Sequence, residues 1–235
     1  MTIRARFDRK LSELRDEILL MGSMVEQELR VALEAYRTLD AEKAKEVIAT
    51  DRVVNRARFE IEEKCFALIV TQQPAARDLR SITTAMNIIV DLERMGDQAK
   101  GIAKVVTHLY ERTTIPRPPE LVEMGKMVRD MLRRAMQAYA EGNIVLAQTV
   151  ANTDEDVDHL YGQVFAQMMD YMAAHDSPDE VEAGYEILRS ARELERFGDL
   201  VTNVAERTIY LVTGSMSELN VEHQPRAFKA GARGQ

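Results

Sequence analysis

The feature that most constrains the fold of this chain is an internal repeat. Residues 21–36 (MGSMVEQELRVALEAY) return 103 positions later as residues 124–139 (MGKMVRDMLRRAMQAY). Residues 92–97 (LERMGD) return 102 positions later as residues 194–199 (LERFGD). Self-similarity at one long and nearly constant spacing indicates a structural unit that is used twice. The 235-residue chain is therefore expected to form two related, closely packed halves.

Each half is expected to consist of helices. Apolar residues recur every three or four positions along the chain, which is the pattern of an amphipathic helix. The pattern predicts helices over residues 4–38, 41–72, 74–111, 120–140, 144–175 and 178–213. A content of 13 Met, no Trp and 6% aromatic residues suits helix-on-helix packing. The predicted fold class is all-α, with six helices in two tandem three-helix bundles related by a pseudo-two-fold axis.

The turns between the helices repeat as well. Asp40 and Asn143 stand at equivalent positions, and both residue types are favoured N-caps. Gly142 is a natural helix stop. Ser177 begins a sequence typical of a capping box. Pro74 is expected in the first turn of a helix, where its missing N–H is tolerated.

The repeat also sets the predicted domain boundaries. The first bundle is expected over residues 1–112 and the second over residues 113–219, and the linker between them contains three prolines. Residues 220–235 lose the helical periodicity and are expected to form a disordered tail.

Charge and cysteine content narrow the functional classes. The net charge of −8 argues against general nucleic-acid binding, which draws most of its affinity from basic surfaces. Cys65 is the only cysteine, so no intramolecular disulfide is possible, and with no visible signal peptide a cytoplasmic location is expected. The longest apolar run, residues 65–70, is far too short to span a membrane, so any membrane association is expected through a partner.

Acidic residues recur at four-residue spacing on the third helix of each half. Glu93 and Asp97 form one such set, and Glu195, Asp199 and Asn203 form the other. Residues four apart lie one turn above another, so their oxygen atoms share a helix face. This face flanks the apolar stripe and should line the rim where a neighbouring helix packs.

The second helices supply a matching set. Asp51 and Asn55 correspond to Asp154 and Asp158, again four residues apart. Stacked carboxylates repel one another. Two such stacks on facing helices are costly unless a cation lies between them, and an all-oxygen set suits Mg²⁺, Ca²⁺, Mn²⁺ or iron.

A single acidic pair on a helix is usually a solvated face, so the metal hypothesis depends on the repetition. The first half is the weaker copy, because Asn55 replaces an acid and Gly101 stands where the second half has Asn203. No phosphate-binding loop, no Glu-x-x-His pair and no activated nucleophile is present in the sequence. A non-enzymatic metal-binding protein is therefore predicted.

Two further segments carry a resemblance to a known family. Residues 71–80 (TQQPAARDLR) and 91–99 (DLERMGDQA) resemble the PhoU family of phosphate-signalling proteins, and the second LERxGD block completes the match. The resemblance covers about residues 1–219. It places the family's Glu/Asp-x-x-x-Asp motif on Glu93 and Asp97 and on Glu195 and Asp199. It places the aspartates of the family's second helices on Asp51, Asp154 and Asp158.

The resemblance implies a cytoplasmic, often dimeric regulator with multinuclear metal clusters, in which iron, manganese, zinc or magnesium would be held. It also implies two partners, the ATPase subunit of the high-affinity phosphate ABC transporter and a sensor histidine kinase. Such a regulator represses the phosphate-starvation response when phosphate is ample. A carboxylate-bridged metalloenzyme, a purely structural dimerising bundle and an accessory of a different phosphate carrier stay open as alternatives.

Overall fold

The structure, a computed structural model, describes residues 3–112 and 115–215, and the predicted tail over residues 220–235 lies outside them. All regular secondary structure in these ranges is helical, which confirms the predicted fold class. The six helices are α1 (Ile3–Thr38), α2 (Ala41–Gln72), α3 (Ala76–Leu109), α4 (Pro119–Glu141), α5 (Ile144–Ala174) and α6 (Pro178–Thr213).

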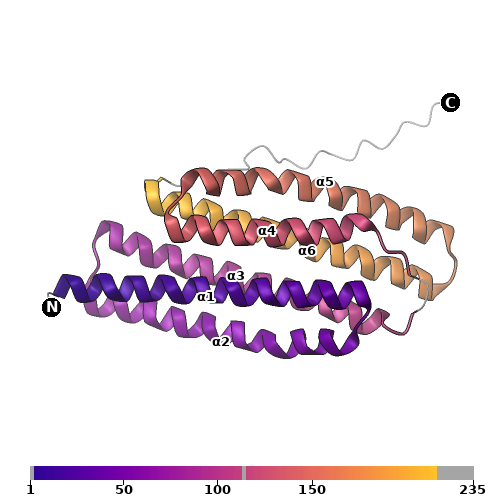
Figure 1. Ribbon diagram of the computed structural model, residues 1–235, viewed down its shortest axis with the longest axis horizontal. Helices are drawn as coiled ribbons and strands as arrows, with labels where there is room; N and C mark the ends of the chain where they lie inside the picture. The colour runs from indigo at the N-terminus through magenta and orange to yellow at the C-terminus, as the bar shows by residue number, and fades with distance from the viewer. Residues whose placement is uncertain (1–2, 113–114, 216–235) are drawn as a thin grey trace.

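The helices form two three-helix bundles that lie side by side along the long axis of the molecule (Figure 1). Helices α1, α2 and α3 contact one another, and so do α4, α5 and α6. The two bundles meet where α3 packs against α6 and α1 packs against α4. Helices α2 and α5 contact only their own bundle and are therefore the outermost pair, as Figure 1 shows.

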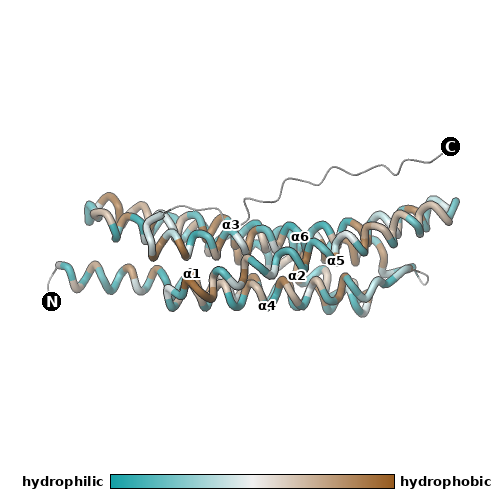
Figure 2. The backbone as a smooth tube through the Cα atoms, turned by 90° about the horizontal axis from the view of Figure 1, so that it is seen from above, coloured by the Kyte–Doolittle hydropathy of each residue, from teal (hydrophilic) through white to brown (hydrophobic). Residues whose placement is uncertain are grey.

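The core follows the apolar periodicity of the sequence. Brown and teal segments alternate along each helix in Figure 2, as expected of helices with one apolar and one polar face. On α1, Ile18, Met21, Val25 and Leu29 are completely buried. The buried apolar residues of both repeats belong to one continuous cluster. Each such side chain stabilises the fold by about 1.5–3 kcal/mol when it leaves water, so the two bundles support each other.

Most of the predicted turns are confirmed. Asp40 accepts hydrogen bonds from two backbone N–H groups of α2, and Asn143 accepts one from the backbone of Leu146 at 3.0 Å. Gly142 ends α4 with φ of 64°. The capping box at Ser177 is wrong, because the side chain of Ser177 makes no cap hydrogen bond. Its backbone carbonyl accepts the first bonds of α6 instead.

The predicted start of the third helix also needs correction. Pro74 was expected in its first turn, but α3 begins at Ala76 after an extended Ala75. The residue before a proline is driven out of the helical region. Here Gln73, just before Pro74, is left-handed and ends α2, so the chain needs a further residue to turn before α3 can start.

Candidate metal centre

The acids of the second repeat gather where α5 packs against α6. Asp154 is buried at 7% exposure, Asp158 and Glu195 are half-buried, and Asp199 is exposed. Gly198 is what lets α6 approach Asp154. A Cβ atom at Gly198 would lie 3.0 Å from Asp154 Oδ1, closer than nearly all real Cβ contacts. The exposure of the four acids thus increases from Asp154, in the protein interior, to Asp199, at the surface.

The electrostatics of this cluster show how the acids affect one another. Burial raises the pKa of Asp154 to about 7, and the negative charges of Asp199, Asp158 and Glu195 add to the shift. Burial and the charge of Asp199 raise the pKa of Glu195 to about 7 as well, although Arg192 pairs with it at 2.8 Å. Burial and Asp158 also raise the pKa of Asp199. Without a bound cation, the cluster therefore retains protons at a pH where isolated carboxyl groups are ionised.

The first repeat brings together the equivalent residues where α2 packs against α3. Asp51 is buried at 3% exposure, Glu93 is half-buried and Asp97 is exposed. A further acid, Glu28 of α1, joins them at 6% exposure. Burial and the charge of Asp51 raise the pKa of Glu28 to about 7. A Cβ atom built on Gly96 would lie 3.3 Å from Glu28 Oε2 and 3.8 Å from Asp51 Oδ1, so both carboxylates face this glycine.

A lysine occupies the first cluster. Lys100 Nζ lies 2.7 Å from Asp51 Oδ2 and 3.5 Å from Asp97 Oδ1, so its ammonium bridges α2 and α3. The side-chain amide of Asn55 also donates to Asp51 Oδ2, at 3.2 Å. Asp51 thus receives a charge-assisted hydrogen bond and an amide hydrogen bond on one oxygen, whereas its Oδ1 is buried without a hydrogen-bond partner.

The interaction recorded for Asn203 is with Asp91 of α3. The side-chain amide of Asn203 favours the ionised form of Asp91, which lowers a pKa that burial has raised to about 6. The equivalent position in the first repeat, Gly101, faces Glu193 of α6, whose Oε1 would lie 2.9 Å from a Cβ there. At 3.6 residues per turn, Asn203 is rotated by about 80° from Glu195 around the helix axis. That rotation carries it from the α5 side of α6 to the α3 side.

The sequence prediction missed Glu28 and Lys100. The sequence does contain a sign of Glu28. This acid occupies a position of the apolar stripe of α1, between Val25 and Ala32, where the helical spacing calls for an apolar residue. An acid in such a position must either find a partner or stay protonated. Lys100 lies three residues after Asp97, within reach along a helix, but its bond to Asp51 depends on how α2 and α3 pack.

The residues of the second cluster suit a metal ion in chemistry. Carboxylates are hard oxygen donors, and Glu195 Oε2 is buried without a hydrogen-bond partner. Over residues 3–112 and 115–215, however, no group of three or more His, Cys, Asp or Glu side chains is already arranged to chelate an ion.

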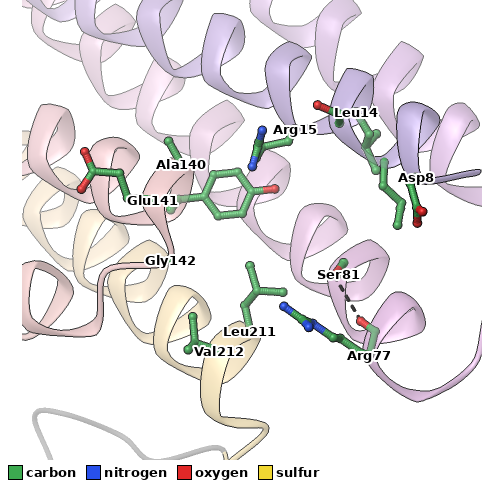
Figure 3. A pocket seen from close by; sticks show the side chains of 13 residues that line it. Asp8, Leu14, Arg15, Arg77, Ser81, Ala140, Glu141, Gly142, Leu211 and Val212 are labelled. Atoms are coloured by element: carbon green, nitrogen blue, oxygen red, sulfur yellow. Dashed lines mark hydrogen bonds between the residues drawn. The ribbon is translucent and has the colours of Figure 1, made fainter. Parts of the chain in front are cut away.

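A separate cleft of about 410 Å³ lies where residues of α1, α3, α4 and α6 meet (Figure 3). Arg15 and Arg77 line it together with Asp8 and Glu141, so its charges are balanced. Ser81 is bonded to the backbone carbonyl of Arg77 at 3.1 Å. None of the predicted site residues lines this cleft. We therefore take the acidic clusters, and not this cleft, as the candidate site.

The fold and the clusters define a class: a duplicated, all-helical protein that holds a set of carboxylates between the second and third helices of each half. The PhoU domain matches residues 18–106 and 121–208. The chain belongs to the PhoU family.

Individual relatives agree with this assignment. Over 215 residues the chain is 39% identical to a phosphate-specific transport system accessory protein PhoU homolog from Clostridium acetobutylicum, covering 91% of this chain and 97% of that protein. The crystal structure of the phosphate transport system regulatory protein PhoU from Streptococcus pneumoniae superposes with a TM-score of 0.83 at 33% identity, covering 90% of this chain and 99% of that one. PhoU from Pseudomonas aeruginosa gives a TM-score of 0.84 at 34% identity, covering 89% and 100%.

The comparisons confirm the resemblance drawn from the sequence and the six-helix architecture. The relatives are named as accessory and regulatory proteins, which confirms the expectation of a non-enzymatic protein. Among the described residues, none of the helices combines the length and the hydrophobicity needed to cross a bilayer.

Proposed function

We propose that this protein regulates phosphate uptake and signalling, and that it binds metal ions at the cluster between α5 and α6. The observation that carries the proposal is the convergence of four carboxyl groups, two of them with a pKa raised to about 7. A carboxyl group that is fully solvated on the surface would keep its ordinary pKa. The names of the relatives, which refer to the phosphate-specific transport system, supply the physiological context.

Asp154, Asp158, Glu195 and Asp199 would hold the metal. A bound iron, manganese, zinc or magnesium ion would supply the positive charge that offsets four mutually repelling carboxylates. Asp154 would be the innermost ligand, and the exposed Asp199 would face solvent or a partner. The carboxyl groups must give up their protons and turn toward a common point, so metal affinity should rise with pH.

The partners that we propose are the ATPase subunit of the phosphate ABC transporter and a sensor histidine kinase. The protein would act in the cytoplasm as a homodimer, and would repress the phosphate-starvation response when phosphate is ample. The metal would stiffen the face formed by α5 and α6, and a partner would recognise that face. The two outermost helices, α2 and α5, offer the surfaces that the molecule leaves free for such contacts.

The test combines metal content with partner capture. Glu195→Ala with Asp199→Ala should remove most of the bound metal, measured by plasma emission spectrometry, and should weaken capture of the ATPase subunit and the kinase. Glu155→Ala with Asp156→Ala is the matched control, because both acids are exposed on α5. Unchanged metal content in the first variant would reject the site. Capture of neither partner by the wild type would favour a purely structural bundle, and turnover of oxygen or a phosphate ester would favour a metalloenzyme.

A further inference from the structure

The two acidic clusters differ most at one pair of equivalent positions. Lys100 of α3 corresponds to Thr202 of α6, one turn beyond Asp97 and Asp199 respectively. Lys100 places its ammonium on Asp51 and Asp97. Thr202 is buried at 5% exposure, and its hydroxyl has no hydrogen-bond partner. One repeat therefore carries a cation where the other carries a small neutral side chain.

The position of the Lys100 ammonium is that of a bridging cation. It contacts one carboxylate from α2 and one from α3, which are the two helices that a metal ion would have to join. Its own exposure is 25% and that of the Asp51 side chain is 4%, so the pair is largely shielded from water. A shielded ion pair is much harder to displace than one on the surface.

The other neighbours of Asp51 point to the same arrangement. The side chain of Asn55 donates to Asp51 with its amide nitrogen, whereas the equivalent Asp158 offers only oxygen atoms. Glu28 adds a buried acid from α1, where the second repeat has Met131. Glu28 Oε2 and Asp51 Oδ1 are both buried without a hydrogen-bond partner. This interior holds more buried acid than its counterpart, which favours a cation that is always present.

We propose that the first repeat carries its own cation, with the Lys100 ammonium in the place that a metal ion takes in the second repeat, so that metal binding is confined to the cluster of α5 and α6. The inference rests on the proposed function, because it assumes that the second cluster binds metal. It makes the protein functionally asymmetric. The acidic cluster of the first repeat is always neutralised by Lys100, whereas neutralisation of the second cluster depends on the metal supply.

The first experiment compares matched double variants after loading with Zn²⁺ and desalting. Glu93→Gln with Asp97→Gln leaves Lys100 in place and should leave the zinc content per chain at the wild-type level. Glu195→Gln with Asp199→Gln should lower it at least tenfold. A loss of zinc in the first pair would overturn the proposal, because it would show that the first cluster contributes ligands.

The second experiment removes the resident cation. Lys100→Thr installs the residue of the second repeat, and it should raise bound zinc about twofold over the wild type. Lys104→Thr, on the exposed face of the same helix, is the control for loss of a positive charge and should bind no additional zinc. Lys100→Ala, a better helix former, is used alongside in case the threonine variant folds poorly, as judged by circular dichroism.

The outcomes separate this inference from the proposed function. If the wild type binds zinc but neither folded Lys100 variant binds more, the role assigned to Lys100 is wrong and the metal site of the second repeat stands. If the wild type binds none while the Lys100 variants do, Lys100 is the resident cation of the first cluster, but the second-repeat site and the confinement of metal to α5 and α6 are both wrong. If no variant binds zinc, both are wrong.

Discussion

Both halves of this protein bury carboxyl groups between their second and third helices, and the two halves differ in what compensates the buried charge. Between α2 and α3, buried Asp51 is neutralised by Lys100 at 2.7 Å. Between α5 and α6, buried Asp154 faces three other acids, and its pKa rises to about 7. A cluster of carboxylates in a protein interior must be compensated by a fixed cation, by protons or by a metal ion. The first repeat places a fixed cation on Asp51, and the second repeat has a threonine, Thr202, at the position equivalent to Lys100.

The same isosteric substitution should therefore have opposite effects in the two halves. Asp51→Asn should destabilise the metal-free protein by about 3 kcal/mol, because it leaves the ammonium of Lys100 without its buried partner. Asp154→Asn should stabilise it by about 1 kcal/mol at pH 8, because it removes one of four repelling charges. Urea unfolding at pH 8 with EDTA measures both. Effects of the same sign and size would show that the two clusters are equivalent.

The pH dependence of stability should follow the raised pKa values. Asp154 and Glu195 titrate near 7 in the folded protein, above the usual range of carboxyl groups. The folded state therefore binds more protons than the unfolded state between about pH 4 and 7. The resulting stabilisation is complete below the unfolded pKa and is lost as the pH rises through 7. We expect the metal-free protein to lose about 2 kcal/mol between pH 5.5 and 8 for each such group that titrates independently.

Two single variants assign this pH dependence to the repeats. Asp154→Asn should reduce the pH dependence of the free energy of unfolding, because it removes a titrating group of the second cluster. Glu28→Gln should reduce the pH dependence through the first cluster, because the pKa of Glu28 is also raised to about 7. Asp130→Asn, an exposed acid of α4, should leave the profile unchanged. If Asp154→Asn left the slope intact, the protons would have to be held elsewhere in the molecule.

Much of this architecture could be predicted from the sequence, because helix periodicity and capping are local properties. The six helices, the cap at Asp40 and the shared face of Glu195 and Asp199 all follow from spacing along the chain. The bond between Lys100 and Asp51 does not, since it spans 49 positions and depends on the packing of α2 against α3. The interaction of Asn203 with Asp91 of α3 depends on packing in the same way. Two helical turns rotate a side chain enough to change the helix that it meets.

The two glycines at equivalent positions of the repeat, Gly96 and Gly198, offer a steric comparison. Gly198→Ala would place a methyl group 3.0 Å from Asp154 Oδ1 and push that carboxylate away from α6. Gly96→Ala would meet Glu28 Oε2 at 3.3 Å. The helix propensity of alanine, worth about 1 kcal/mol, should offset much of the steric cost in both. We expect stability changes within about 1 kcal/mol in each, measured by urea unfolding.

Zinc binding distinguishes the two glycine variants. Gly198→Ala should weaken zinc affinity about tenfold in titration calorimetry, equivalent to about 1.4 kcal/mol, because it moves the innermost ligand. Gly96→Ala should leave the affinity unchanged, because its neighbours belong to the cluster that Lys100 already neutralises. Equal weakening by both would mean that zinc is shared between the repeats.

The smallest expected effect concerns Asn203. Asn203→Ala removes the amide that favours ionised Asp91 across the contact between α3 and α6, and it should cost about 0.5–1 kcal/mol because the Asn203 side chain is exposed. Zinc content should stay at the wild-type level, as it should in Asn152→Ala, an exposed asparagine of α5 that serves as the control. A fall in zinc content specific to Asn203→Ala would restore this residue to the ligand set. It would also mean that metal binding draws the side chain away from Asp91, and that the second cluster is coupled to the interface between the two bundles.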